Sequence, residues 1–492
     1  MTRFQAGTLD FASNRYTLLL AAVLAGLLAF RLLALNLNQT DLFFDEAQYW
    51  AWSQELALGY FSKPPLIAWI IRLTTDICGS GEFCVRLASP ILYTIAAVFI
   101  YLAGAKLYDA ATGFWSAIIF ATVPGISFSA SIISTDVPLL LCWCAALFAW
   151  IKLQETRKAG WAVALGLALG LGLLAKYAMV YFLLCAGLYV VTTPDARWML
   201  RNTGSLLVLL IAGVLIAPNL IWNAQVGWVT VSHTAANANW AGDLFKPLKM
   251  LEFLGAQFGV FGPILFAILI WIAIRAARGP TDPPERMLLY FSVPVIVIIT
   301  LQALISRAHA NWAAAAYPAA TILVTATMLR LDFKWLFRAS LVLHLIVLVV
   351  LAAANSVAPV LVLPGKADPY ARVLGWGEVA GVVNNELQAN PYGTVLTVDR
   401  LVTAEMLYYL RNQPVPILAW SPSEVPRDHF ELTRPFGARA GQPVLLVTLR
   451  PTANHVTDEF ESVEPIGEYK VPAGPKSNRT VSLFALSGYR GK

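Results

Sequence analysis

The sequence predicts a polytopic α-helical membrane protein with a small α/β domain at its C-terminus. Of the 492 residues, 58% are hydrophobic and only 13% are charged, about half the charged share of a typical soluble protein. Apolar runs long enough to cross a bilayer, about 20 residues each, recur up to about residue 358. Beyond that point the pattern changes to short helices alternating with strands.

The apolar runs predict about eleven transmembrane helices. We expect them at 17–36, 88–107, 113–133, 137–152, 161–175, 178–193, 204–222, 250–274, 287–305, 312–329 and 339–358. Arg3 and Arg15 precede the first run, and alternate loops carry most of the remaining basic residues. By the positive-inside rule those loops face the cytoplasm. This places the N-terminus inside and the C-terminus outside.

The C-terminal segment, 359–492, is predicted to form a separate domain on the outer face. Residues 375–420 read as helix, strand, helix, strand, and "PVLLVTL" and "VSLFAL" read as further strands. The first domain is expected to cover 1–358 and to include the outer loop 37–87. Within that loop, Tyr49, Trp52, Leu56 and Tyr60 have helical spacing, which predicts a helix lying in the membrane interface.

The net charge of +6 does not indicate nucleic-acid binding, because the basic residues are scattered between apolar runs. Positive-inside loops account for them. Three of the five cysteines lie in apolar stretches, where buried thiols are expected. Cys78 and Cys84 flank "GSGEF" in a polar loop. They would form a disulfide only if this loop faces an oxidising compartment. The sequence leaves both the disulfide and the free thiols open.

Two acids, Asp45 and Glu46, follow the first apolar run in "LNQTDLFFDEAQYWAW". Each has a structural interpretation. Asp45 with Gln48 three residues later resembles a capping box, and Glu46 would be a first-turn acid favoured by the helix dipole. For either acid taken alone, the structural interpretation is the better one.

Further polar residues fall at helix-connecting turns on the same predicted outer side. Asp136 in "SIISTDVPLLL" could be an N-cap, and Lys176 in "GLLAKYAMVYF" could extend to the interface. "ISRAHANWAAAAYP" brings Arg307, His309 and Asn311 together. A purely structural role is a weaker explanation for these polar residues taken together, because placing ionisable groups inside a membrane costs free energy. Cations near the headgroup level suit a lipid-linked phosphate, and carboxylates beside them suit activation of a hydroxyl.

Several motifs together resemble the bacterial GT-C glycosyltransferases of the protein O-mannosyltransferase and lipid A aminoarabinose transferase type. They are "FFDEAQYWAW", "GYFSKPPLIAWI", "EFCVRLASPI", "STDVPLLL" and "LLAKYAMVYF". The resemblance covers roughly residues 15 to 320. "SRAHANWAAAAYP" is more similar to the branch that includes the lipopolysaccharide galacturonosyltransferases. The resemblance implies transfer of a sugar from a polyprenyl phosphate on the periplasmic side of the bacterial inner membrane.

Carried over residue by residue, the resemblance makes Asp45 the essential acid of the first outer loop and Asp136 the second acid. Glu46 is the second position of the acidic pair, and Lys63 is the lysine of a "K-P" motif. The remaining expected substrate-binding residues are Tyr60, Lys176, Arg307 and His309.

The implied mechanism is an inverting transfer. Lys63, with Lys176 or Arg307, would stabilise the departing lipid phosphate. Asp45 would deprotonate the acceptor hydroxyl as general base, and Asp136 would position acceptor or sugar, or hold Lys63. The loop 223–249, with His233, would form a lid over an acceptor cleft. We expect no cofactor and no metal, although related oligosaccharyltransferases use a divalent ion, and we expect a monomer.

Alternative functions stay open. The acceptor is expected to be lipid A or the lipopolysaccharide core, with a protein acceptor as the alternative. A lipid-linked sugar transporter is the main competitor from another class. It would place ionisable groups near the bilayer midplane and contain paired repeats, whereas here the charges gather on one face. A receptor would need a cytoplasmic output domain, and the cytoplasmic loops are too short for one.

Overall fold

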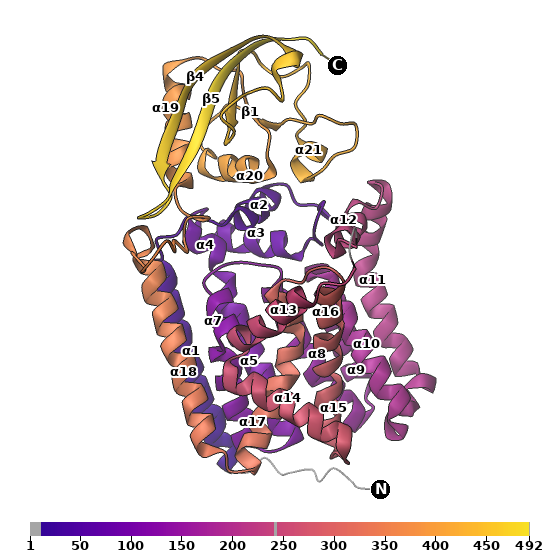
Figure 1. The fold of residues 1–492 in the computed structure, drawn as a ribbon. Helices are drawn as coiled ribbons and strands as arrows, with labels where there is room; N and C mark the ends of the chain where they lie inside the picture. The colour runs from indigo at the N-terminus through magenta and orange to yellow at the C-terminus, as the bar shows by residue number, and fades with distance from the viewer. Residues whose placement is uncertain (1–10, 241–243, 492) are drawn as a thin grey trace. The chain divides into compact units, whose positions relative to one another are not determined.

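The computed structural model describes residues 11–240 and 244–491, which form helices and one mixed β-sheet (Figure 1). Contacts within the chain divide it into two compact units. The first unit comprises 1–35, 63–67 and 86–352, and the second comprises 36–62, 68–85 and 353–492. The helical membrane protein with a small C-terminal sheet domain that the sequence predicts is confirmed.

The first unit is entirely helical in the part that the structure describes. Its helices are α1 (Phe11–Asn36), α5 (Ala88–Leu107), α6 (Ala110–Thr122), α7 (Pro124–Ser129), α8 (Asp136–Thr156), α9 (Ala159–Ala175), η1 (Tyr177–Met179), α10 (Val180–Thr192), η2 (Pro194–Arg201), α11 (Thr203–Gln225), α12 (Val229–Ala238), α13 (Pro247–Val260), α14 (Pro263–Arg278), α15 (Pro283–Tyr290), α16 (Val293–Ile305), η3 (Ala310–Ala316), α17 (Tyr317–Arg330) and α18 (Lys334–Ser356). The predicted loop 223–249 therefore contains a helix, α12.

The predicted count of eleven spans is not confirmed. Among the described residues, seven helices are long and apolar enough to cross a membrane, or up to nine if each of two bent pairs is one span. Two further apolar helices, α6 and α9, are shorter. The predicted span 113–133 fails because α6 ends at Thr122, just before Pro124. Its 13 residues cover about 20 Å at 1.5 Å per residue, less than the bilayer core.

The predicted span 250–274 is broken. Between α13 and α14 the chain bends by 117° at Gly262, which has φ +94°. A Cβ at Gly262 would lie 2.5 Å from Nε2 of His344 in α18. Hydropathy does not detect such a bend, because the apolar run continues through it.

Two helices form the centre of the first unit. In α8 and in the span formed by η3 and α17, 78% and 83% of the most apolar window is buried, against 22% in α11 and α18. A helix that is hydrophobic all round belongs in a core. Asp136 is the first residue of α8. Its backbone is therefore held by a helix that is mostly enclosed by its neighbours.

The second unit contains the helices of the first outer loop and the C-terminal α/β fold. Its elements are α2 (Phe44–Gln54), α3 (Leu66–Cys78), α4 (Glu82–Arg86), η4 (Ala358–Val360), α19 (Trp376–Ala389), β1 (Thr394–Thr397), α20 (Arg400–Tyr409), β2 (Ile417–Ala419), α21 (His429–Thr433), β3 (Val444–Thr448), η5 (Thr457–Glu459), β4 (Phe460–Pro472) and β5 (Asn478–Tyr489).

The sheet has strand order β2-β1-β3-β5-β4. The first three strands are parallel, and β5 pairs antiparallel with β3 and β4. One face packs against α19 and α20 through a core that includes Trp376, Val383 and Met406. The helices and strands predicted over 375–420, and the strands in "PVLLVTL" and "VSLFAL", are confirmed. The sequence analysis missed β4, an edge strand whose charged and proline residues hide its pattern.

Most of the first outer loop groups with the C-terminal residues rather than with the transmembrane helices. Helix α2 packs against α20, with the rings of Trp50 and Tyr408 edge to face at 5.0 Å. The predicted interfacial helix is therefore shorter than expected: α2 ends at Gln54, and its Tyr49, Trp50 and Trp52 are buried. The division of the chain into two domains at 358/359 stays a prediction.

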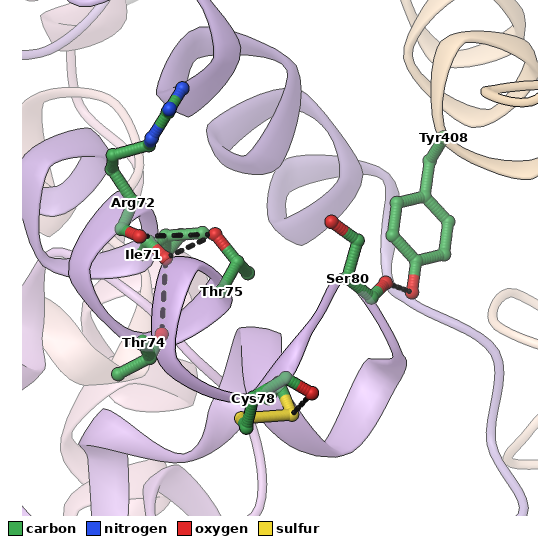
Figure 2. Close-up of a disulfide and its surroundings, with 8 residues drawn as sticks. Ile71, Arg72, Thr74, Thr75, Cys78, Ser80 and Tyr408 are labelled. Carbon is green, nitrogen blue, oxygen red and sulfur yellow. Dashed lines mark hydrogen bonds between the residues drawn. A yellow bond between two sulfur atoms is a disulfide. The ribbon is translucent and has the colours of Figure 1, made fainter.

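A disulfide joins Cys78 and Cys84. The sequence alone left both the bridged and the free state of these cysteines open. The disulfide closes the turn between α3 and α4. Figure 2 shows this turn, where the hydroxyl of Tyr408 donates a hydrogen bond to the carbonyl oxygen of Ser80 at 2.7 Å. The C-terminal fold therefore contacts the loop at its disulfide-closed end as well as at α2.

Candidate active site

In the first unit, three segments meet at the carboxylate of Asp136. Its Oδ1 accepts a hydrogen bond from Nζ of Lys176 at 2.7 Å, and its Oδ2 accepts one from Nδ2 of Asn311 at 2.6 Å. The Asp136 side chain is only 9% exposed and that of Lys176 20%. Both oxygens of this buried carboxylate are thus partnered, one of them by a cation.

Local structure explains why Asp136 is available for these contacts. The N-cap of α8 is Thr135, and no side chain caps this helix. The N-cap interpretation of Asp136 is therefore wrong. Lys176 is the C-cap residue of α9, where the chain becomes extended, and this directs its side chain away from the helix.

Asn311 is positioned by the broken helix pair. It lies in η3, where the carbonyl oxygen of Ala310 accepts a hydrogen bond from Nε2 of Gln257 at 3.2 Å. Gln257 is fully buried at the end of α13 and also accepts a hydrogen bond from the hydroxyl of Tyr317. The helix pair that bends at Gly262 thus helps to position Asn311.

Three cations act electrostatically on His309. Its pKa lies below the usual value, mainly because the ring is partly removed from water and then because Arg307, Lys176 and Lys63 repel its proton. The imidazole is therefore neutral at pH 7, with its ring edge to face against Trp312 at 5.3 Å. Three of the predicted cations thus act on the same histidine.

A cavity of about 330 Å³ reaches Asp136 and Asn311. Tyr93 and Ser129 also line it and bond to each other, hydroxyl to Oγ, at 2.8 Å. The rest of its wall is mainly apolar, with Phe120, Val123, Ile126, Phe128, Leu140 and Val260 among the lining residues. An apolar cavity with a few convergent polar groups is the usual form of a ligand site.

In the second unit, Asp45 contacts the C-terminal fold. Arg400, the first residue of α20, donates from Nη1 to Oδ1 of Asp45 at 3.2 Å and to Oε1 of Gln48 at 2.8 Å. Its guanidinium also lies over the ring of Phe44, 4.9 Å from the centroid. Asp45 lies in the first turn of α2 but is not its N-cap, which is Phe43. The capping-box interpretation of Asp45 is therefore wrong.

Glu46 lies in the first turn of α2, as the structural interpretation expects, and it makes a capping contact that the sequence analysis did not predict. Its Oε2 accepts a hydrogen bond from the backbone N–H of Phe43 at 2.9 Å, and the residue is 1% exposed. Tyr60 is fully buried and stacks on Trp52 at 4.6 Å. Burial raises the pKa of its phenol to about 12, and its hydroxyl bonds to the carbonyl oxygen of Trp52 at 2.9 Å.

The structure places the predicted site residues in two groups. Asp136 and Lys176 are in direct contact, and Lys63, Arg307 and His309 share their unit. Asp45, Glu46 and Tyr60 belong to the second unit. Sequence reasoning did not select Asn311, Gln48 or Arg400. Asn311 was visible beside His309, whereas Arg400 lies 355 residues from Asp45 and carries no local signal.

The described residues contain no group of three or more His, Cys, Asp or Glu side chains that could hold a metal ion. Independence of a metal stays a prediction.

Comparison with known proteins identifies the family. The lipid A galacturonosyltransferase RgtD of Rhizobium johnstonii is 34% identical over 468 residues, covering 94% of this chain and 97% of the relative. The chain belongs to this GT-C glycosyltransferase family. The undecaprenyl phosphate-alpha-4-amino-4-deoxy-L-arabinose arabinosyl transferase of Pseudomonas savastanoi pv. phaseolicola is 29% identical over 177 residues, 32% of each chain.

Residues 62–222 of the glycosyltransferase match the family described as dolichyl-phosphate-mannose-protein mannosyltransferase. The crystal structure of ArnT from Cupriavidus metallidurans bound to undecaprenyl phosphate has the same fold, with a TM-score of 0.68 at 15% identity. It covers 96% of this chain and 98% of its own. The transmembrane helices and the C-terminal sheet domain are thus both parts of the shared fold.

Proposed function

We propose that this glycosyltransferase moves galacturonic acid from a polyprenyl phosphate to lipid A at the periplasmic face of the inner membrane. The observation that carries the proposal is the full-length similarity to a lipid A galacturonosyltransferase. Lys63, Lys176 and Arg307 support it, because this donor carries negative charge on its phosphate and on its sugar. Lys176 forms an ion pair with Asp136.

In the proposed reaction, a hydroxyl oxygen of the acceptor attacks the anomeric carbon of the donor sugar. The bond from that carbon to the phosphate oxygen breaks, and the lipid phosphate leaves with the bonding electron pair. Asp45 accepts the hydroxyl proton as general base, and in-line attack inverts the anomeric centre. Lys63 and Arg307 stabilise the phosphate charge.

Asp136 is proposed to position the transferred sugar. Lys176 and Asn311 occupy both of its oxygens, which suits a fixed orienting group better than a base that must accept a proton. The pair is buried, and a charge-assisted hydrogen bond of this kind is stronger than a neutral one. His309 is proposed to form a hydrogen bond with the substrate as a neutral imidazole. Glu46 is proposed as the second acid of the acidic pair. Its observed contact is the hydrogen bond to the backbone N–H of Phe43 at the start of α2.

The proposed orientation has the N-terminus in the cytoplasm and the C-terminal domain in the periplasm. Disulfides persist in oxidising compartments, and the bridge between Cys78 and Cys84 favours a periplasmic position for this loop. We propose that the enzyme acts as a monomer.

The proposal is tested by mass spectrometry of lipid A from cells that lack this gene. Cells complemented with wild type are expected to regain a hexuronic acid on lipid A, and cells carrying Asp45→Asn are not, since losing a general base costs about 10²–10⁴-fold in rate. Asp76→Asn is a matched control, because Asp76 is an exposed acid of the same loop, paired with Arg72.

Other outcomes redirect the proposal. A different sugar on lipid A would replace galacturonic acid, and a sugar on proteins alone would favour the protein glycosyltransferase suggested by the match over 62–222. Full activity of Asp45→Asn at equal membrane abundance would contradict the proposed base. An unchanged glycan profile together with a changed distribution of lipid-linked sugar across the membrane would favour a transporter.

A further inference from the structure

The residue that contacts the proposed base comes from the far end of the chain. Arg400 begins α20 in the C-terminal fold, with two residues between it and the end of strand β1. Its guanidinium makes three contacts with the first turns of α2: an ion pair with Asp45, a hydrogen bond to Gln48 and a cation–π contact with Phe44. All of these residues lie within the second unit.

We propose that Arg400 is a positioning residue for Asp45, so that the C-terminal domain takes part in catalysis by setting the rotamer of the general base. This inference rests on the role of Asp45 in the proposed function. Arg400 contacts Oδ1 of Asp45, and no described residue donates a hydrogen bond to Oδ2. One carboxylate oxygen is thus fixed while the other is left for the acceptor hydroxyl.

The geometry explains why an arginine serves here. Its Nη1 donates to both Asp45 and Gln48, and its planar guanidinium can at the same time lie flat over a ring, a face that a lysine ammonium lacks. The ring of Phe44 supports the guanidinium face, and Gln48, one turn along α2, accepts the shorter hydrogen bond. Arg400 therefore stays in place independently of Asp45, as a positioning group must.

The neighbouring acid does not compete for this guanidinium. Asp399, the N-cap residue of α20, pairs instead with Nη2 of Arg450 at 3.4 Å. Asp45 is 38% exposed and Arg400 34%, so the carboxylate stays open to solvent and substrate while it is held.

The competing explanation is that Arg400 only attaches α2 to the C-terminal fold. A second ion pair in the same unit provides a matched control. Arg434 of the C-terminal fold pairs with Glu55, the C-cap residue of α2, and does not contact Asp45. If attachment is all that matters, Arg400→Ala and Arg434→Ala should have similar effects.

The test measures kcat and KM of the purified full-length protein with a polyprenyl-phosphate galacturonic acid as donor and lipid A as acceptor. Arg400→Ala is expected to lower kcat by about 10- to 100-fold, because a misplacement of about 1 Å can cost this much. KM for the donor should change by less than about threefold, Arg400→Lys should recover part of kcat, and Arg434→Ala should resemble wild type.

A double-mutant cycle separates positioning from folding. In an Asp45→Asn background, Arg400→Ala should have no further effect on the residual rate, since the group it positions is gone. Equal kcat losses for Arg400→Ala and Arg434→Ala, or a full additional loss in the Asp45→Asn background, would overturn the inference while leaving the proposed function intact. A wild-type enzyme that does not use this donor would overturn both.

Discussion

The carboxylate of Asp136 is held from two directions that are far apart in the chain, by Lys176 at the end of α9 and by Asn311 in η3. Its own place is fixed by α8, the most enclosed helix after α17. Asp136 and Lys176 were recognisable from sequence because they stand at the ends of apolar runs. Their pairing was not, because it depends on tertiary contacts across 40 residues.

We expect Asn311→Leu to lower kcat by about 10- to 100-fold and to lower Tm by several degrees. The variant removes a hydrogen bond to a charged group, worth about 1.5–3 kcal/mol, and lets the proposed orienting carboxylate rotate. Turnover and Tm of the detergent-extracted protein would be measured together. Asn390→Leu is the control, since Asn390 is exposed and bonds only to Glu386 on its own helix. A wild-type kcat for Asn311→Leu would show that Oδ2 of Asp136 needs no partner.

At the scale of elements, the break between α13 and α14 is the feature that hydropathy could not reveal. The run 250–274 is apolar throughout, and only the dipeptide Gly262–Pro263 signals a turn. The break orients α13 so that Gln257 reaches the backbone of Ala310 in η3. An irregularity in one helix pair therefore supports the position of Asn311.

We expect Gly262→Ala to destabilise the protein by about 1–3 kcal/mol, because φ +94° is accessible to glycine and strained for other residues. The added methyl group would also meet His344. Gly259→Ala is the matched control in the preceding helix, where a Cβ meets no atom within 4 Å and alanine favours the helix. Thermal unfolding in one detergent would compare the two. Partial recovery of Tm in Gly262→Ala with His344→Ala would assign the steric part, and equal Tm values for both glycine variants would refute the strain argument.

At the scale of the whole chain, the ion pairs of the first unit agree with the alternation of loops that the basic residues predict. Lys106 in the last turn of α5 pairs with Glu155 at the end of α8 at 2.5 Å. Arg330, the last residue of α17, pairs with Glu285 at the start of α15 at 3.1 Å. Both pairs join segments predicted to be cytoplasmic. The sidedness itself stays a prediction, which rests on loop charge as a local property of the sequence. The sequence could not predict that Arg400 would meet Asp45, because no local pattern encodes a contact between the two ends of a chain.

The orientation itself is a prediction that fusions can test. Alkaline phosphatase is active only after export, so a fusion following residue 491 is expected to be active and one in the 157–158 turn inactive. Cytoplasmic fluorescent fusions should give the reverse pattern. In intact cells, Cys78 and Cys84 should resist alkylation until a reductant is added, because the bridge between them persists in an oxidising compartment. An active phosphatase at 157–158 would invert the topology. It would also move Asp45, Arg400 and the disulfide to the reducing side of the membrane, where the bridge would not persist.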